Sequence, residues 1–202
     1  MVMMLARTAL VRARRATVPG GAPVTWNPLD KSEDVTLSNL DMTMTADDTS
    51  TLGARATVGN STGKWYAEFT HSSPGGDFLA VGVATASYGF TSTPGFGLTS
   101  FVYFPELGSV YHNSSVVESV GTTADGTRIM MALDMSNLKV WFGSAGTWFS
   151  SDNPATNTGG YTIPSGTWFP LASVNEGGDS CTAYFSAASQ SHGAPSGFSP
   201  WG

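Results

Sequence analysis

Residue types that commonly carry out catalysis or bind metals are few in this chain and widely spaced. The histidines are His71, His112 and His192, and the single cysteine is Cys181. Protein metal sites draw on ligands at short, regular spacings, so these positions predict no metal centre and no cofactor. One cysteine excludes an intramolecular disulfide. Cys181 also stands in a stretch of strand-forming residues, which favours a small buried side chain over a catalytic thiol.

The acidic residues form no recognisable catalytic pair. Asp47 and Asp48 are adjacent, and neighbours on a strand point to opposite faces, so they suit glycoside hydrolysis poorly. Asp30, Glu33 and Asp34 lack the spacing of a calcium-binding loop. The chain has no Gly-x-Ser-x-Gly elbow, phosphate-binding loop or dinucleotide fingerprint. We therefore expect a protein that is not an enzyme, and a hydrolase using Asp47 or Asp48 is the alternative.

Aromatic side chains gather in residues 86–115, where glycine and proline interrupt any regular pattern. Tyr88, Phe90, Phe96 and Tyr103 lie among Gly, Pro and Ser, which favours positions in loops. Aromatic rings anchor protein interfaces and stack on sugars, because they offer a large rigid area at low entropic cost. We predict that these four residues bind a ligand or partner, and the alternative is that they fill the core.

Two other places offer aromatic contacts. Trp148, together with the loop at residues 153–160, is a second candidate for binding a partner. The end of the chain contains Phe198 and Trp201. We expect these rings to be exposed and suited to docking on a neighbouring subunit.

Charge is divided unevenly along the chain. Residues 1–22 carry +4, because they contain no acidic residue and four arginines, Arg7, Arg12, Arg14 and Arg15. The remainder contains 5 basic and 15 acidic residues and carries −10. An acidic domain repels nucleic acid, so we expect the domain not to bind nucleic acid. The basic arm is suited to an acidic surface on a neighbouring subunit.

The N-terminal residues differ in pattern from the rest. Val2, Leu5, Ala9 and Arg12 recur at helical spacing, which predicts a short helix over about residues 2–15 or else an extended arm. The arginines follow the apolar run, unlike in a secretory signal peptide, although a mitochondrial transit peptide shares this composition. No stretch reaches the roughly 18 apolar residues that a membrane span needs.

From residue 24 the apolar pattern changes to the period of two that strands show. Charged residues are only 12% of the chain, whereas Gly (24) and Pro (11) are frequent, which is typical of short strands joined by tight turns. No helical pattern separates the strands, so we expect an all-β fold, a two-sheet antiparallel β-sandwich over residues 24–186. Residues 1–23 would then form the basic arm and its linker, and residues 187–202 a tail rich in Gly, Ser and Pro.

Four segments occur in the order and at the spacing found in SPRY domains. Gly63–Phe69 resembles the GKxYxEV strand of that family, and Val81–Ala84 resembles its GVGxA strand. Met131–Phe142 resembles the family's ALDL hairpin, and Trp168–Val174 its xYPaVSl strand. The chain departs from the family where Gly143–Gly146 replaces Asn-Gly after the aromatic strand, although glycine still permits a turn.

The resemblance spans about residues 26–186 and implies a jelly-roll-like sandwich that presents loops from one edge and binds peptides, proteins or glycans without catalysis. Thr25–Ser32, and the stretch from Lys139–Phe142 through Asn153–Thr156, are similar to SPRY-like domains of tailed-phage structural proteins. We therefore expect a virion structural protein of decoration, collar or tail-fibre type, anchored by its arm to other virion proteins within a homo-oligomeric assembly. The alternatives are a host-receptor or glycan-binding adhesin and a cytoplasmic SPRY interaction module of a cell.

Overall fold

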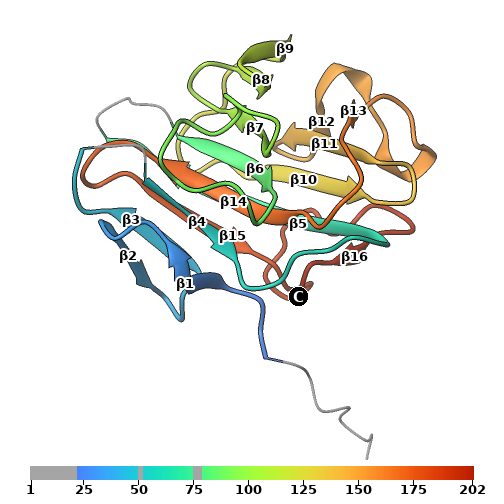
Figure 1. Ribbon diagram of the computed structural model, residues 1–202. Coiled ribbons are helices and arrows are strands. Elements are labelled where there is room, and N and C mark those ends of the chain that lie inside the picture. Colours follow the sequence, from blue (N-terminus) through green and yellow to red (C-terminus); the bar gives the residue numbers. More distant parts are fainter. Residues whose placement is uncertain (1–21, 50–51, 75–78) are drawn as a thin grey trace, which may run out of the picture.

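The computed structural model describes residues 22–49, 52–74 and 79–202, and these residues form two β-sheets packed face to face (Figure 1). The architecture confirms the predicted all-β sandwich. The basic arm and its predicted helix lie outside the described residues. Over the described ranges, no helix combines the length and the apolar character needed to cross a membrane.

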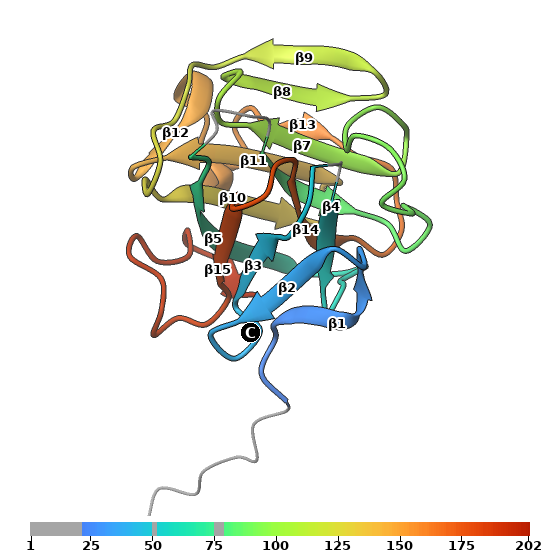
Figure 2. The ribbon, with the colours of Figure 1, turned by 90° about the vertical axis from the view of Figure 1, so that its left-hand side faces the viewer.

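The first sheet has seven antiparallel strands in the order β1-β4-β14-β6-β7-β8-β9. Strand β9 therefore forms one edge of this sheet, at the top of both ribbon views (Figures 1 and 2). The strands are β1 (Trp26–Lys31), β4 (Leu52–Ala56), β6 (Ala80–Ala84), β7 (Ser100–Phe104), β8 (Ser109–His112), β9 (Ser115–Ser119) and β14 (Phe169–Val174).

The second sheet has nine strands. Its main path is β12-β11-β10-β5-β15-β3-β2, with β13 beside β11 and β16 beside β5. Strand β16 runs parallel to β5, whereas the other pairs are antiparallel. The strands are β2 (Val35–Ser38), β3 (Thr43–Ala46), β5 (Lys64–Ser72), β10 (Ile129–Asp134), β11 (Lys139–Ser144), β12 (Thr147–Trp148), β13 (Tyr161–Thr162), β15 (Ser180–Tyr184) and β16 (Ser199–Pro200). Two short 3-10 helices, η1 (Phe149–Ser151) and η2 (Pro154–Thr156), follow β12.

Local turn chemistry explains the hairpins of the second sheet. The buried carboxylate of Asp134 accepts hydrogen bonds from the backbone nitrogens of Ser136 (2.8 Å) and Asn137 (3.0 Å), which closes the turn between β10 and β11. The next turn places Ala145 (φ 51°) and Gly146 (φ 84°) between β11 and β12. Both residues have the positive φ that a two-residue type I′ turn requires, so the departure from Asn-Gly is accommodated.

Aromatic rings join the two sheets in the core. Trp26 of β1 lies 6.1 Å from Phe69 of β5 and 5.6 Å from Phe185, measured between ring centroids. All three side chains are at most 1% exposed, and large rings of this kind contribute most of the buried apolar area of a core. Cys181 of β15 is buried in the same cluster, which confirms its prediction as a small core side chain.

Both sheets are also covered on their outer faces. On the second sheet, Tyr66, Met130, Ala132 and Trp141 form a cluster with Phe198 from the C-terminal segment. On the first sheet, Tyr88 and Phe90 of the connection at residues 85–99 pack on residues of β6, β7 and β14. Burial on two faces explains why several strands are continuously apolar, since neither face of such a strand meets water.

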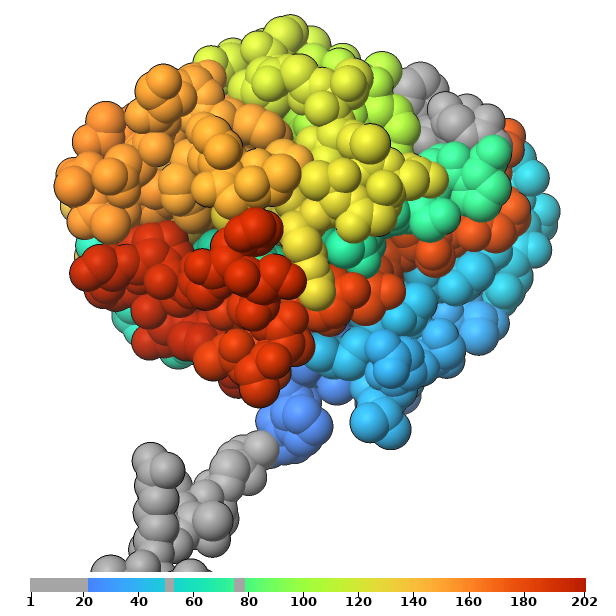
Figure 3. All heavy atoms as spheres, turned by 180° about the vertical axis from the view of Figure 1, so that it is seen from behind, coloured from blue at the N-terminus to red at the C-terminus, as the bar shows by residue number. Residues whose placement is uncertain are grey.

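The C-terminal segment is part of the sandwich, and the expectation that its aromatic rings are exposed is wrong. Trp201 is 2% exposed, and its indole nitrogen donates to the carbonyl of Val58 at 2.9 Å. The buried carboxylate of Glu68 accepts from the backbone nitrogens of Ser191 and His192, both at 2.8 Å. In the space-filling view the segment fits closely against the body (Figure 3). Its many small residues suit this close packing but look like a free tail in the sequence.

We predict that Trp201→Ala lowers the free energy of unfolding by about 3–5 kcal/mol, because it removes a buried ring and leaves the Val58 carbonyl without its partner. Urea denaturation of the full chain measures the change. Leu29→Ala is the control, since Leu29 is 95% exposed and its loss should cost less than about 0.5 kcal/mol. Equal stability of the two variants would show that the segment is not part of the folded unit.

Candidate binding surface

The connection at residues 85–99 is fixed to the first sheet by a buried arginine. Arg55 of β4 is 5% exposed and forms a bidentate ion pair with Asp30, at 2.8 Å from Nε and 2.6 Å from Nη2. Its remaining nitrogen donates to the carbonyls of Thr85 and Tyr88. The guanidinium also lies 4.8 Å from the centre of the Phe90 ring. This set of contacts holds the start of the connection in place.

Tyr88 and Phe90 support the connection and do not project from it. Tyr88 lies in a loop, as predicted, but is 4% exposed, and its hydroxyl donates to the carbonyl of Ser92 at 2.6 Å. Its ring meets Phe90 edge to face at 5.3 Å, and Phe90 is half-buried. A partner therefore reaches little of either ring.

Tyr103 and Trp148 also lie away from open loops. Tyr103 is in β7 with no exposed area, and its hydroxyl bonds to the carbonyl of Gly121 (2.7 Å) and the hydroxyl of Thr123 (2.9 Å). Its prediction as a loop residue is wrong, because two short strands, β7 and β8, lie within the stretch expected to be irregular. Trp148 is half-buried in β12, with its ring edge-on to Tyr66 at 6.2 Å.

Phe96 is the predicted residue that the structure places at the surface. Its side chain is 52% exposed, and its ring stacks on Tyr111 of β8 at 5.9 Å with an interplanar angle of 11°. Ser114 fixes the backbone here, because its nitrogen donates to the carbonyl of Gly95 (2.9 Å) and its hydroxyl to that of Phe96 (2.8 Å). The backbone that carries the ring is therefore fixed, and stacking on Tyr111 orients the ring at the surface.

A groove runs beside Phe96 on the outer face of the first sheet. Its volume is about 410 Å3, and most of its lining is apolar. Phe104 of β7 forms the floor, with its ring edge-on to Tyr111 at 5.2 Å. We call this feature the Phe96 groove; it is lined by Thr93, Phe96, Phe104, Leu107 and Tyr111.

The edge strand β9 extends this apolar surface. Val116 and Val117 are 49% and 46% exposed. Val116 stands directly opposite Tyr111 in the ladder between β8 and β9, so the two side chains share the face that carries the Phe96 groove. The register shifts after this pair, and such a bulge twists an edge and limits how far another strand can pair with it.

Glu118 holds β9 against the second sheet. Its carboxylate accepts hydrogen bonds from the hydroxyl of Tyr161 in β13 (2.7 Å) and from that of Ser150 in η1. Burial, together with this bond to Glu118, raises the pKa of the Tyr161 hydroxyl, so Tyr161 remains a proton donor. Besides pairing with β8, the strand is thus positioned by side chains from β13 of the second sheet and from η1.

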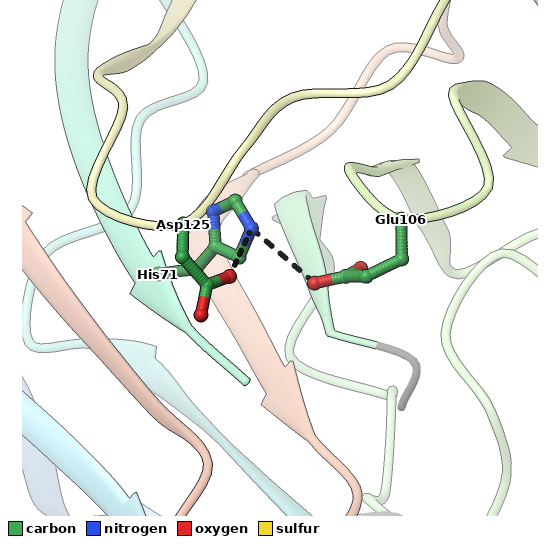
Figure 4. Close-up of side chains that lie close together, drawn as sticks. All are labelled: His71, Glu106 and Asp125. Atoms are coloured by element: carbon green, nitrogen blue, oxygen red, sulfur yellow. Dashed lines mark ion pairs between the residues drawn. The ribbon is translucent and has the colours of Figure 1, made fainter. Parts of the chain in front are cut away.

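Titratable side chains meet at one further place that the sequence spacing did not reveal. His71, Glu106 and Asp125 each offer a ligand atom to a common point, with those atoms all within 4.8 Å of one another (Figure 4). The residues are separated in sequence by whole strands, so a search for short ligand spacings misses them. The other predicted polar residues show no comparable grouping within the described ranges: Asp47 accepts from Thr36, and Asp48 from the backbone of Thr49.

Comparison with solved structures identifies the fold. The chain superposes on the SPRY domain of human HERC1 with a TM-score of 0.66 and 16% identity, over 78% of this chain and 96% of that one. The PSpry domain of TRIM65 gives a TM-score of 0.65 and 16% identity, over 80% of this chain and 91% of that one. No protein-family model and no curated protein matches the sequence. The chain therefore has the SPRY fold, at a sequence distance that establishes the fold alone.

Cys181 has an environment that suppresses thiol chemistry. It has no exposed area, and burial, with a smaller contribution from the charge of Glu106, raises the pKa of its thiol. The thiolate is the reactive form of cysteine, so a raised pKa opposes the nucleophilic role that the sequence left as an alternative.

We predict that Cys181 in the folded chain does not react with Ellman's reagent at pH 8, whereas one thiol per chain reacts in guanidinium. The reason is that the sulfur of Cys181 is buried and protonated, whereas the reagent reacts with an accessible thiolate. Absorbance of the released thiolate measures the reaction. Rapid reaction of the native chain would revive a catalytic or redox role for this residue.

Proposed function

We propose that this chain is a non-enzymatic binding module that holds an apolar, extended segment of a protein partner in the Phe96 groove. The observation that carries the proposal is the continuity of the groove with the exposed edge strand β9. Of the eight large apolar side chains exposed in the described residues, five come from residues 96–117. These are Phe96, Leu98, Leu107, Val116 and Val117. Clustered apolar exposure of this kind marks interaction surfaces.

The shape of the surface favours a peptide segment. Phe96 and Tyr111 present stacked rings that are already rigid, so binding costs little side-chain entropy. Beside them, β9 offers backbone groups that pair on one side with β8, and an extended partner segment could pair on the other side. The bulge in β9 keeps such pairing short, so side chains inserted into the groove would supply most of the affinity.

We infer further that the partner belongs to a phage particle, of which this chain is a structural component. The support is the similarity of its sequence to phage SPRY-like domains and the contrast between a +4 arm and a −10 body. A positively charged arm suits the negatively charged surface of a neighbouring subunit. Exposed Glu33, Asp34, Asp47 and Asp48 make this subunit's own surface a suitable acceptor for a second copy's arm, which would give a homo-oligomer.

The chain enters the sandwich at one end of the molecule, and β8 and β9 beside the Phe96 groove lie at the other end (Figures 1 and 2). This separation suits a module that is anchored by its N-terminal arm and displays the groove for binding. In Figure 1 the chain enters the sandwich at the bottom, close to β1 and β2, whereas β8 and β9 lie at the top. Figure 2 shows the same separation after the turn of 90°. An arm attached at one end would therefore leave the Phe96 groove free at the other. If the displayed groove meets a host receptor or glycan instead of a virion protein, the chain acts as an adhesin. In a cell, the same groove would serve a cytoplasmic interaction module.

We predict that peptides selected from a displayed random library against the full chain lose at least about tenfold in affinity for the Phe96→Ser variant, because the substitution removes a rigid anchor from the groove. Fluorescence anisotropy with the selected peptide measures the Kd. Leu29→Ser is the matched control, since Leu29 is the more exposed side chain and belongs to β1. Equal affinity of wild type and Phe96→Ser, or selective retention by a glycan array, would overturn the peptide-groove proposal.

For the arm, we predict that deletion of residues 1–22 lowers the copy number of the protein on purified particles of its phage at least about tenfold, because the deletion removes the positive charges of the anchor. Quantitative mass spectrometry of the particles measures occupancy. Replacement of Arg7, Arg12, Arg14 and Arg15 by glutamine tests charge without changing length. Full occupancy of particles by the deletion variant would contradict anchoring by the arm. Absence of the wild-type protein from particles would contradict the virion role.

A further inference from the structure

The cluster of His71, Glu106 and Asp125 joins three segments of the chain. His71 is in β5, Glu106 in the turn after β7, and Asp125 in the loop before β10 (Figure 4). The Nε2 atom of His71 lies 3.3 Å from a carboxylate oxygen of Glu106 and 3.2 Å from one of Asp125. Both sheets therefore contribute to this single point.

His71 is buried without a hydrogen-bonding partner for its ring. The residue is 2% exposed, and neither ring nitrogen makes a hydrogen bond of acceptable geometry within the described part of the chain. The Oε1 atom of Glu106, which faces His71, is also unbonded there. Buried imidazole and carboxylate groups normally have hydrogen-bonding or metal partners, and one cation between them would satisfy both.

The carboxylates are oriented by bonds at their other oxygens. Oε2 of Glu106 accepts from the backbone nitrogen of Leu79 at 3.3 Å, and Oδ2 of Asp125 accepts from that of Ser73 at 2.9 Å. The backbone nitrogen of Gly126 donates to the carbonyl of His71 at 2.8 Å. Each carboxylate thus has one oxygen fixed by a backbone nitrogen and one oxygen directed at the imidazole. In metal sites, hydrogen bonds of this kind orient the side chains that bind the metal.

Charge at this point also favours a cation. Asp179 is 1% exposed and lies close enough to interact electrostatically with both His71 and Glu106. The carboxyl groups of Glu106 and Asp125 face the same imidazole, and carboxylate oxygens are common ligands of divalent cations.

The donor set and its spacing select the kind of cation. Tetrahedral zinc has ligand bonds of about 2.0–2.2 Å, which places donor atoms roughly 3.3–3.6 Å apart. The two N···O distances, 3.3 and 3.2 Å, are close to this value, and the two carboxylate oxygens lie within 4.8 Å of each other. One imidazole with two carboxylates suits zinc and similar divalent transition metals, whereas calcium takes six to eight oxygen ligands.

We propose that His71, Glu106 and Asp125 form a binding site for one divalent transition-metal ion of the zinc type. The side chain of Asp125 is 49% exposed, so the ion has a path from solvent and a position for water. The bound ion links β5 and the loop before β10 to the turn after β7, and so ties the two sheets together in a chain that has one cysteine. It also fixes Glu106 next to Leu107, which lines the Phe96 groove.

The test is calorimetric titration of the full chain, freed of any affinity tag and treated with EDTA, with zinc chloride alone. We expect one ion per chain, a rise in Tm on zinc addition, and an absorption band in the visible range when cobalt replaces zinc. Asp125→Asn and His71→Asn should each weaken zinc binding at least about tenfold. Asp125 is half exposed, so its variant is expected to fold even if substitution of the buried His71 disturbs the core.

His192→Asn is the matched control, because His192 is an exposed histidine away from the cluster. It should bind zinc as the wild type does. The proposal is overturned if the wild type binds no zinc, if Asp125→Asn binds it unchanged, or if His192→Asn removes the binding and so reveals an adventitious surface ion. Calcium binding as tight as zinc binding would contradict the assignment to a transition metal. These outcomes do not depend on whether the Phe96 groove binds a partner.

Discussion

Burial of the facing sides of the two sheets is the constraint on which the rest of this structure depends. With one cysteine, the chain has no disulfide to join the sheets, so the packing of Trp26 on Phe69 and Phe185 must do so. The outer faces are then closed by the chain's own segments, the connection at residues 85–99 over one sheet and the C-terminal residues over the other. The region around β8 and β9 is less covered, and five of the eight large apolar side chains exposed in the described residues come from residues 96–117.

The sequence predicted the sandwich well because strand periodicity and turn residues are local signals. The strands Lys64–Ser72, Ile129–Asp134 and Phe169–Val174 overlap three of the segments in which the sequence resembles strands of SPRY domains. Long-range contacts were not predictable in the same way. Nothing near Trp201 shows that it packs beside Trp65, 6.3 Å away. Nothing near Tyr103 shows that it lies in a strand of the first sheet with its ring buried against Phe142 of the second. Phe96 was predicted in a loop and is exposed there, although its role as an anchor stays a prediction.

Motifs shared with SPRY domains account for the fold more than for a binding site. Glu68 in the first motif holds the C-terminal segment, and Asp134 in the hairpin motif closes a turn. The surface that we propose for binding lies in the part of the chain that carried no motif. The cluster of His71, Glu106 and Asp125 was equally hidden, because its members are brought together only by the pairing of strands far apart in sequence. This chain is 16% identical to the two solved SPRY structures, so its function has to be inferred from its own side chains rather than from the fold.

Site-specific photo-crosslinking can show whether the Phe96 groove holds a protein partner. The full chain would carry p-benzoylphenylalanine at position 96 or, as the control, at position 29, and would be irradiated in the particles or cells that produce it. If the groove holds a partner, position 96 will crosslink to an apolar segment of one partner protein, located by mass spectrometry, and position 29 will not crosslink to that segment. Identical products from both positions, or no protein product from position 96, would contradict the proposal that the groove holds a partner.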